Sequence, residues 1–273
     1  MFISNCHTHT NYCDGKCSAR EMVEAAVKNG FVSLGFSGHS PMKDKNSWTM
    51  SADDVALYKD EITALREEYK DKIDILCGIE LDADYDFVKP LDFDYVIGSV
   101  HQLKKGDKAY DVDHTAEILK EAVKELFGGS FIEMSKVYFK ALADFVVSEK
   151  VDVVGHIDLI TKFNVDAPLF DESDCQYRKL AFEAVDRILA AKPDILFEVN
   201  TGAMFRVGKK EPYPAHFLLE YIRQKGGRIT LTSDSHHVDS IAFGFEKAEE
   251  LIRKCGFSEI YYLTSQGIKA CKL

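Results

Sequence analysis

Residues 1–15 read MFISNCHTHTNYCDG, a short apolar run that leads into two histidines and, shortly after them, Asp14. Side chains two positions apart on an extended strand point to the same face, so His7 and His9 are expected to project together into one space. Two imidazoles aimed at one point are typical of a metal site, although an alternating strand also carries two exposed histidines by chance. The meaning of this pair therefore depends on what the rest of the chain brings beside it.

Seven apolar segments with strand character follow one another along the chain, at residues 2–6, 33–37, 73–79, 95–100, 151–155, 195–199 and 228–232. Amphipathic segments of helical period lie between and after them, at residues 19–29, 52–69, 115–127, 132–148, 172–191, 215–225 and 241–255. Ser18, with Glu21 three residues later, and Ser51 are predicted N-caps. Strands that alternate with helices predict βαβ units, hence a parallel sheet covered by helices.

An open doubly wound sheet and a closed barrel both satisfy this alternation. Every strand of a barrel delivers its C-terminal end to one shared mouth, whereas an open sheet gathers only the strands near its switch point. Nearly every predicted strand ends in a potential ligand, which favours a single α/β domain over residues 1–273, a distorted seven-stranded barrel, with residues 259–263 as a further candidate strand. The longest irregular segments, residues 41–50, 82–93 and 102–113, are expected at the mouth as substrate-facing loops.

The composition limits the classes of function. The 273 residues are 46% hydrophobic and contain no apolar run of the ~20 residues needed to cross a bilayer, nor the pattern of a signal peptide. The seven cysteines, an odd and scattered set, fit reduced thiols, so we expect a cytoplasmic protein. A net charge of −11 opposes a nucleic-acid partner, because binding to phosphates normally requires a basic surface. A small-molecule substrate is expected, with neither a nucleic acid nor a membrane as partner.

Residues with metal-ligand chemistry recur at the ends of the predicted strands: His7, His9, Asp14, His39, Glu80, His101, His156, Asp234 and His236. Imidazole nitrogen and carboxylate oxygen suit zinc, manganese and iron, and a carboxylate also bridges two ions. Nine ligands exceed what one ion can use, so a multinuclear site is expected, with Glu80 on a central strand as the bridge. The other three histidines, His114, His216 and His237, fall away from strand ends and are expected at the surface.

The chain resembles the PHP (polymerase and histidinol phosphatase) superfamily in motifs that extend over almost its whole length: His7-Thr8-His9-Thr10, Ser37-Gly38-His39-Ser40, Gly78-Ile79-Glu80, Gly98-Ser99-Val100-His101, Gly155-His156-Ile157-Asp158-Leu159-Ile160, Glu198-Val199-Asn200-Thr201 and Thr232-Ser233-Asp234-Ser235-His236. The resemblance implies a distorted (β/α)7 barrel, three divalent ions (zinc, manganese or iron) and a histidinol-phosphatase activity, the hydrolysis of L-histidinol phosphate in histidine biosynthesis. The segment Asn200-Thr201-Gly202-Ala203 departs from the commoner Asn-Thr-Ser-Gly of the superfamily, which bears on the substrate rather than on the metals.

The resemblance also implies which residues hold each ion. One ion is assigned to His7, His9, Glu80 and Asp234, a second to Glu80, His101 and His156, and a third to Asp14, His39 and His236. Three divalent ions, balanced by three carboxylates and a metal-bridging hydroxide, leave a charge that matches a phosphate dianion. We assign catalytic roles to Asp234 and His236, with Asp234 as a candidate carrier of the proton released at the hydroxide.

Substrate contacts are predicted from residue chemistry in the mouth loops. Arg206 is the candidate phosphate clamp through its planar fork, the alternative being a surface arginine paired with a nearby acid; Lys104 and Lys105 are poorer candidates. The imidazole and ammonium of histidinol phosphate call for an acid and an aromatic wall. The available aromatic residues, which in the alternative only cap their loops, are Trp48, Tyr85, Phe87 and Tyr110.

Other functions fit parts of the same pattern. One is the same chemistry on another small phosphomonoester, such as a nucleotide or sugar phosphate. Another is a non-catalytic metal-binding accessory module, like the barrels attached to some bacterial polymerases, although the complete ligand set argues against a degenerate copy. A structural zinc knuckle at Cys13 and Cys17, with Cys6 nearby, is disfavoured by the irregular thiol spacing.

Overall fold

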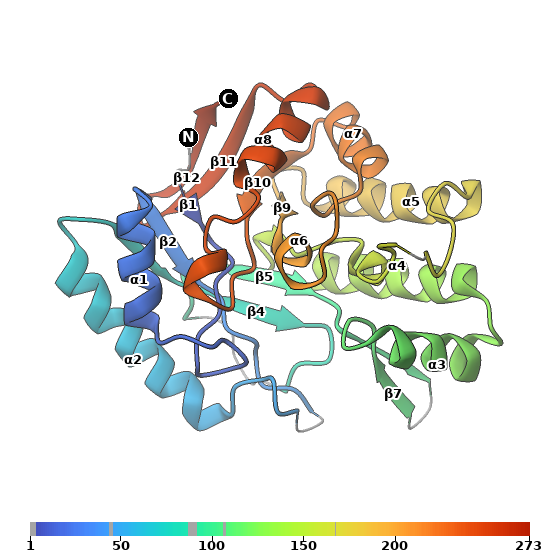
Figure 1. The fold of residues 1–273 in the computed structure, drawn as a ribbon, viewed down its shortest axis with the longest axis horizontal. Helices are drawn as coiled ribbons and strands as arrows, with labels where there is room; N and C mark the ends of the chain where they lie inside the picture. The colour runs from blue at the N-terminus through green and yellow to red at the C-terminus, as the bar shows by residue number, and fades with distance from the viewer. Residues whose placement is uncertain (1–3, 44–45, 87–91, 106–107, 167) are drawn as a thin grey trace.

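The structure is a computed structural model, and it describes residues 4–43, 46–86, 92–105, 108–166 and 168–273. It is an α/β fold in which parallel strands lie at the centre and helices surround them (Figure 1). None of the helices in these ranges combines the length and the apolar character required to span a bilayer. The predicted α/β class is therefore confirmed.

The parallel strands form two sheets. The first has the order β1 (Ser4–Asn5), β2 (Ser33–Phe36) and β3 (Asp74–Cys77). The second has the order β10 (Arg228–Thr232), β9 (Leu196–Asn200), β8 (Val153–Val154), β5 (Val96–Ser99) and β4 (Ile79–Asp82). The predicted single strand at residues 73–79 is wrong in detail, because the ladder breaks at Gly78 and β3 and β4 pair in different sheets.

Backbone hydrogen bonds connect the two sheets at both ends. On one side, Gly78 N–H donates to the Phe36 carbonyl over 2.7 Å, and Glu80 N–H donates to the Gly38 carbonyl over 3.1 Å. On the other side, His9 N–H donates to the Ser235 carbonyl over 2.8 Å, and Ser235 N–H donates back to the His7 carbonyl over 3.1 Å. The chain segments that follow β1, β2 and β10 are thereby fixed side by side.

Tyr95 fills the space at one of these junctions. Its hydroxyl donates to the Cys6 carbonyl over 2.6 Å and also lies 3.0 Å from the Phe36 carbonyl. A Cβ on Gly35 would approach the Tyr95 hydroxyl oxygen to 2.3 Å, and one on Gly78 would approach the ring carbon Cζ to 2.3 Å. Glycine is therefore required at both positions because the tyrosine passes directly over them.

The helices have the bounds α1 (Ala19–Lys28), α2 (Ala52–Tyr69), α3 (Ala116–Phe127), α4 (Phe131–Ser148), α5 (Cys175–Ala191), α6 (Gly202–Arg206), α7 (His216–Gln224) and α8 (Phe245–Lys254). All seven predicted helices are present, and α6 is an addition. Ser18 and Ser51 cap α1 and α2 as predicted, each in a reciprocal capping box with the acid three residues later. The buried faces of these helices pack on the strands and form most of the hydrophobic core.

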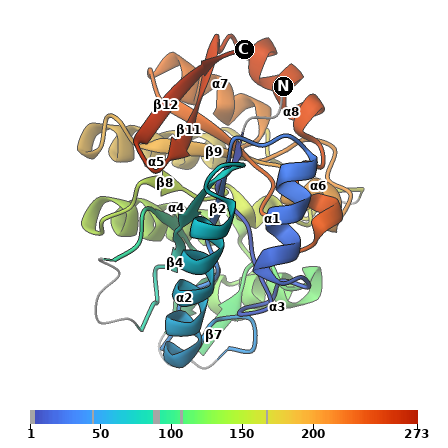
Figure 2. The same cartoon turned by 90° about the vertical axis from the view of Figure 1, so that its left-hand side faces the viewer.

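Two antiparallel hairpins complete the fold. The strands β6 (Gln102–Lys105) and β7 (Lys108–Asp111) lie where an irregular loop was expected, so that expectation is wrong for residues 102–105 and 108–111. The further strand predicted at residues 259–263 exists as β11 (Glu259–Thr264), but it pairs antiparallel with β12 (Gly267–Lys272) instead of joining the parallel sheets. Figure 2 shows this second hairpin beside α8.

The second hairpin lies at the N-terminal ends of the parallel strands. The Ser33 hydroxyl at the start of β2 donates to the Leu263 carbonyl over 2.8 Å. The Asp74 carboxylate at the start of β3 accepts the Ser265 N–H over 2.7 Å. The hairpin therefore covers the N-terminal ends of the strands and leaves their C-terminal ends for the polar residues.

Candidate metal centre

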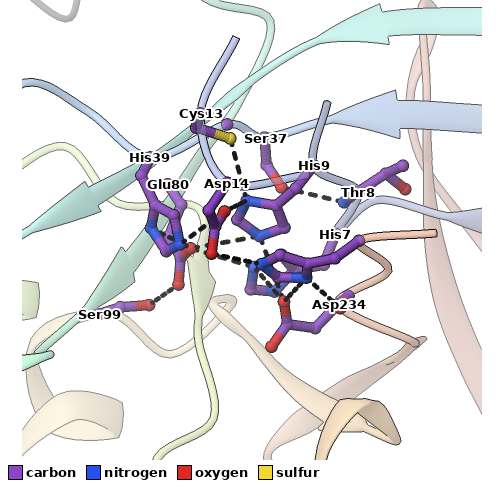
Figure 3. A network of polar contacts seen from close by, with 12 residues as sticks. His7, Thr8, His9, Cys13, Asp14, Ser37, His39, Glu80, Ser99 and Asp234 are labelled. Atoms are coloured by element: carbon purple, nitrogen blue, oxygen red, sulfur yellow. Dashed lines mark hydrogen bonds and ion pairs between the residues drawn. The ribbon is translucent and has the colours of Figure 1, made fainter. Parts of the chain in front are cut away.

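All nine sequence-predicted ligands come together at the C-terminal ends of the parallel strands. Figure 3 shows six of them, from four different segments of the chain, pointing toward one another. Eight of the nine have buried or largely buried side chains, and Asp14 is the most exposed, at 32%. Burial of this many titratable groups is costly unless they are paired or bind ions, so the cluster is not a core of satisfied histidines.

A tight turn places Asp14 in the cluster. Cys13 N–H and Gly15 N–H both donate to the Thr10 carbonyl, over 3.0 and 3.1 Å. A Cβ on Gly15 would lie only 2.6 Å from the Thr10 backbone nitrogen, so the chain can fold back this closely only with glycine there. The turn carries the Asp14 carboxylate to 3.7 Å from His9 Nδ1.

The first predicted ligand group surrounds the Nε2 atoms of His7 and His9. His7 Nε2 lies 3.3 Å from Glu80 Oε2 and 3.6 Å from Asp234 Oδ1. His9 Nε2 lies 3.6 Å from the same Glu80 oxygen and 3.2 Å from the same Asp234 oxygen. Two imidazole nitrogens and two carboxylate oxygens therefore face one common space.

The second and third predicted groups use the remaining residues. Glu80 Oε1 lies 3.5 Å from His101 Nε2 and 3.1 Å from His156 Nε2, so the two Glu80 oxygens face different groups. Asp14 Oδ1 lies 3.7 Å from His39 Nε2, and Asp14 Oδ2 lies 3.1 Å from His236 Nε2.

Neighbouring groups share members. His9 also lies with Asp14, His39 and His236 in one set of mutually close ligand atoms, and His39 lies with Glu80 and His101 in another. His39 Nδ1 is 3.0 Å from Glu80 Oε2, which makes Glu80 the residue that contacts all three groups. This central place agrees with the bridging role predicted for Glu80.

Unpartnered polar atoms show that these residues fit divalent cations. His7 Nε2, His9 Nε2, Asp14 Oδ1 and Glu80 Oε2 are buried and make no hydrogen bond. Buried polar atoms almost always have a partner, so four such atoms turned toward the same cluster indicate a positively charged ligand. Their mixture of imidazole nitrogen and carboxylate oxygen is a donor set that zinc, manganese and iron accept, and the residues can therefore hold divalent metal.

Electrostatics keep the carboxylates of the cluster ionised. Burial alone would raise the pKa of Glu80, but the charges of His7, His39 and His101 hold it well below its usual range. The pKa of Asp234 is likewise well below its usual range, because Arg206 and His7 outweigh its burial. For His9, in contrast, burial prevails. Together with the neighbouring His236 and His39, it lowers the pKa of His9 to about 3 and keeps the imidazole neutral, the form that binds metal.

Sequence reasoning missed Glu198, which supports the cluster from β9. Its Oε2 accepts the Nδ1–H of His7 over 2.8 Å and the Thr232 hydroxyl over 3.0 Å. Its Oε1 accepts the His156 N–H over 2.6 Å and the Asn200 amide over 2.7 Å. A carboxylate that holds the other nitrogen of a metal-binding histidine fixes its tautomer and orientation. The signal was present, since Glu198 is an acid inside a predicted apolar strand and within one of the quoted motifs.

Asp82 and Ser99 are two further supporting residues. Asp82 Oδ2 lies 3.0 Å from His101 Nδ1 and also accepts the His101 N–H over 2.8 Å. The Ser99 hydroxyl donates to Glu80 Oε1 over 2.6 Å. Asp82 follows Glu80 by two residues on β4 and so lies on the same face, a spacing that could have identified it.

Arg206 lies on α6 and contacts Asp234 rather than open solvent. Its Nη2 is 2.6 Å from Asp234 Oδ2, its Nη1 is 3.2 Å from Asp234 Oδ1, and its side chain is 26% exposed. The same Nη1 lies 2.8 Å from His236 Nδ1. Asp234 has a φ of +47°, a left-handed conformation that a non-glycine residue adopts at a cost and that recurs at functional sites. The alternative prediction, that Arg206 pairs with a nearby acid, is thus correct. The acid is Asp234, which is itself one of the candidate metal ligands.

A cavity of about 340 Å³ opens onto the cluster. One wall consists of candidate ligands, including His39, His101 and Asp234. The lining also includes Asp113, Lys162, Phe205, Arg206 and His237. His237 was expected only at the surface; it is partly exposed, and it also lines this cavity.

Of the aromatic residues predicted to contact the substrate, Trp48 lies beside candidate ligands, whereas Tyr85 and Tyr110 do not line the cavity. The Trp48 ring packs edge-on against His39, with 4.8 Å between ring centroids, and lies 5.5 Å from His101. Tyr85 instead donates its hydroxyl to Glu149 over 3.2 Å, Tyr110 lies on β7, and neither lines the cavity. Lys104 pairs with Asp84. Phe87 lies outside the described residues.

The cysteines form no metal group of their own. All seven are free thiols, and none belongs to the metal-compatible groups found among the described residues. Cys13 Sγ lies 3.5 Å from His9 Nδ1 and 3.4 Å from the Thr10 carbonyl. The sulfur therefore supports a candidate ligand, which agrees with the judgement against a zinc knuckle.

Comparison with known proteins finds relatives that align with nearly the whole chain. The chain is 30% identical to the histidinol-phosphatase of Lactococcus lactis over 97% of its own length and 95% of the relative's, and 25% identical to that of Bacillus subtilis over 88% and 96%. The crystal structure of histidinol phosphate phosphatase from L. lactis, complexed with zinc, L-histidinol and phosphate, superposes with a TM-score of 0.75 at 25% identity, covering 98% of each chain. The family model described as the PHP domain matches residues 5–202. The chain therefore belongs to the PHP domain family.

Proposed function

We propose that this protein is a metal-dependent phosphomonoesterase that hydrolyses L-histidinol phosphate to L-histidinol and phosphate. The observation that carries the proposal is the convergence of nine histidine, aspartate and glutamate side chains in one cluster, six of which line the cavity, with five of their buried atoms unpartnered. The relatives named histidinol-phosphatase, aligned over nearly the full chain, support the choice of substrate. Location in the cytoplasm stays a prediction.

Three divalent ions are proposed, with the ligand sets predicted from the sequence. The distances support this division, because Asp14 and Glu80 each turn their two oxygens toward different histidines. We also infer that the two parallel sheets close into one distorted (β/α)7 barrel that makes residues 1–273 a single phosphoesterase unit. The backbone hydrogen bonds that join the sheets through Gly78 and Ser235 support closure.

The ions would supply the positive charge that neutralises the phosphate oxygens and would activate water for attack. Residues around the candidate ligands orient the imidazoles that would bind these ions. Glu198 orients His7, and Asp82 orients His101, so that each imidazole presents Nε2 to the cluster of candidate ligands. Asp234 and His236 are the proposed catalytic residues, with Asp234 accepting a proton at its carboxylate during attack.

Arg206 is the proposed phosphate contact. It lines the cavity, and its guanidinium already holds a carboxylate through two nitrogens, the geometry that also suits a phosphate. Burial lowers the pKa of this guanidinium, but the charge and hydrogen bonds of Asp234, together with the charge of Asp113, outweigh burial and raise it, so the group stays cationic.

A phosphate panel tests the proposed function. Enzyme reconstituted with zinc is expected to hydrolyse histidinol phosphate with a kcat/KM at least about a hundredfold above that for nucleotide and sugar phosphates, since binding of a complementary substrate portion is worth several kcal/mol in the transition state. Comparable values across the panel would favour a general phosphomonoesterase. His7→Ala is the matched control: it should lose metal and most activity while its circular dichroism stays that of the wild type.

A further inference from the structure

One carboxylate in the cavity wall has no part in the metal cluster. Among the described residues that line the cavity, the acids are Asp14, Asp113 and Asp234. Asp14 and Asp234 belong to the nine candidate ligands, which leaves Asp113. An acid so placed faces the substrate rather than the metals.

The hairpin β6–β7 fixes Asp113 beside the cluster. The hairpin starts directly after His101 and returns the chain to it, because Val112 N–H donates to the His101 carbonyl over 2.8 Å. Asp113 follows at once and is therefore anchored next to a candidate ligand, although it lies twelve positions after His101 in the sequence. The loop expected here from sequence would not have held the carboxylate in one position.

Lys162 holds the Asp113 side chain but occupies only part of the hydrogen-bonding capacity of its carboxylate. The Lys162 ammonium donates to Asp113 Oδ2 over 2.8 Å and to the Asp113 carbonyl over 2.6 Å. The exposed fractions of the two side chains are 11% for Lys162 and 23% for Asp113, so the carboxylate keeps the more open face. An ionised carboxylate accepts about four hydrogen bonds, which leaves room for a second cation. The pair is thus a rigid acceptor at the rim of the cavity.

The chemistry of histidinol phosphate matches this arrangement. Its ammonium is on the carbon next to the one that bears the phosphate ester, so an ester bound at the metal cluster keeps the ammonium within a few ångströms of it. Apart from the candidate metal ligands, the other charged residues of the wall are Lys16, Lys162 and Arg206, which are cations and would repel an ammonium. Asp113 is the acid available to receive it.

We infer that Asp113 is a specificity-determining residue that binds the substrate ammonium, with Lys162 as the residue that positions it. This inference rests on the proposed function and names a contact within the same cavity. It predicts that the chain discriminates in favour of phosphate esters with an adjacent amine.

The test compares two substrates that differ only in the amine, histidinol phosphate and 3-(imidazol-4-yl)propyl phosphate. For Asp113→Asn, kcat/KM for histidinol phosphate should fall about ten- to a hundredfold, mainly through KM, while that for the amine-free ester stays within about threefold, as expected for loss of one charge-assisted hydrogen bond. Binding of L-histidinol, followed by calorimetry without turnover, should weaken by a similar factor.

Two further variants make the result specific. Asp111→Asn, on the same hairpin but outside the cavity lining, should leave both substrates unchanged. Lys162→Met leaves the Asp113 charge in place but removes the contact that positions it, so the preference for the amine should fall, though clearly less than in Asp113→Asn.

Four results would overturn the inference. Equal losses on both substrates in Asp113→Asn, or a preference lost as fully in Lys162→Met, would make the pair a scaffold only. A wild-type preference that Asp113→Asn leaves intact would overturn this inference alone. Absence of histidinol phosphate hydrolysis by the wild type would overturn the proposed function and the inference with it.

Discussion

His7 Nδ1 donates to Glu198 Oε2 over 2.8 Å, and both side chains are fully buried. The other Glu198 oxygen accepts the backbone N–H of His156 over 2.6 Å, so one acid fixes two candidate ligands from different strands. In the neutral, metal-binding form of His7, with the proton on Nδ1, the lone pair of Nε2 faces Glu80 and Asp234. The readiness of the site for metal therefore depends on a residue outside the nine ligands.

Glu198→Gln should weaken zinc affinity by about ten- to a hundredfold, because the amide is a poorer acceptor for the Nδ1–H of His7. Titration of chelator-treated protein against a competing zinc indicator measures the change. Glu121→Gln, on the exposed face of α3, is the matched control and should bind zinc like the wild type. Unchanged affinity in Glu198→Gln would mean that the cluster holds its geometry without this contact.

Replacing Arg206 tests its predicted contact with phosphate. Arg206→Lys keeps the charge but loses the planar fork, and Arg206→Ala loses both, so inhibition by inorganic phosphate should weaken about tenfold or more in each. The inhibition constant is measured with zinc-saturated enzyme. If it stays at the wild-type value in both variants, Arg206 serves only as the partner of Asp234.

Gly78→Ala should destabilise the fold by about 1–3 kcal/mol or more, as expected for overpacking. Its Cβ would lie 2.3 to 2.6 Å from three ring carbons of Tyr95, and that ring is anchored through its hydroxyl. Urea unfolding measures the loss. In the double variant, Tyr95→Leu should lower the free energy of unfolding by less than it does in the wild-type background, since the two residues are in contact. Strict additivity of the two effects would contradict this packing.

Stability should depend on pH through Asp158. Burial raises the pKa of this carboxyl to about 6, against an ordinary value near 4, so the folded state binds its proton more tightly than the unfolded state does. The free energy of unfolding therefore falls as pH rises from about 4 through about 6 and stays lower above that range.

Asp158→Asn removes this dependence. The amide oxygen can still accept the Ala215 N–H, which the Asp158 carboxylate accepts over 2.8 Å. Relative to the wild type, the variant should gain on the order of 1–3 kcal/mol between pH 4.5 and pH 7.5 in urea unfolding with chelator present. A difference that stays constant over this range would show that Asp158 does not titrate there.

Local patterns predicted the strands, the long helices and the ligand set because each depends on short-range spacing. His7 and His9 share a face through alternation, and Ser18 caps α1 through a contact three residues away. The convergence of the candidate ligands follows from the rule that parallel strands present their C-terminal ends together, and their binding of metal stays a prediction.

Contacts that depend on distant packing could not be read in the same way. The break at Gly78 arises because Tyr95, seventeen residues later, fills the junction between the sheets. Glu198 supports His7 across 191 positions of sequence. Asp113 reaches the cavity because residues 102–105 pair with residues 108–111 in a hairpin, and the mixed composition of these two strands gives little strand signal in the sequence.

Zinc titration of the chelator-treated wild-type protein, with histidinol phosphate hydrolysis followed at each addition, is the decisive experiment for a three-ion phosphatase. We expect no turnover in the stripped protein and a rise in activity that saturates as the bound metal approaches three ions per chain. Full turnover in the stripped protein, or three bound ions without hydrolysis of any phosphomonoester, would contradict this proposal.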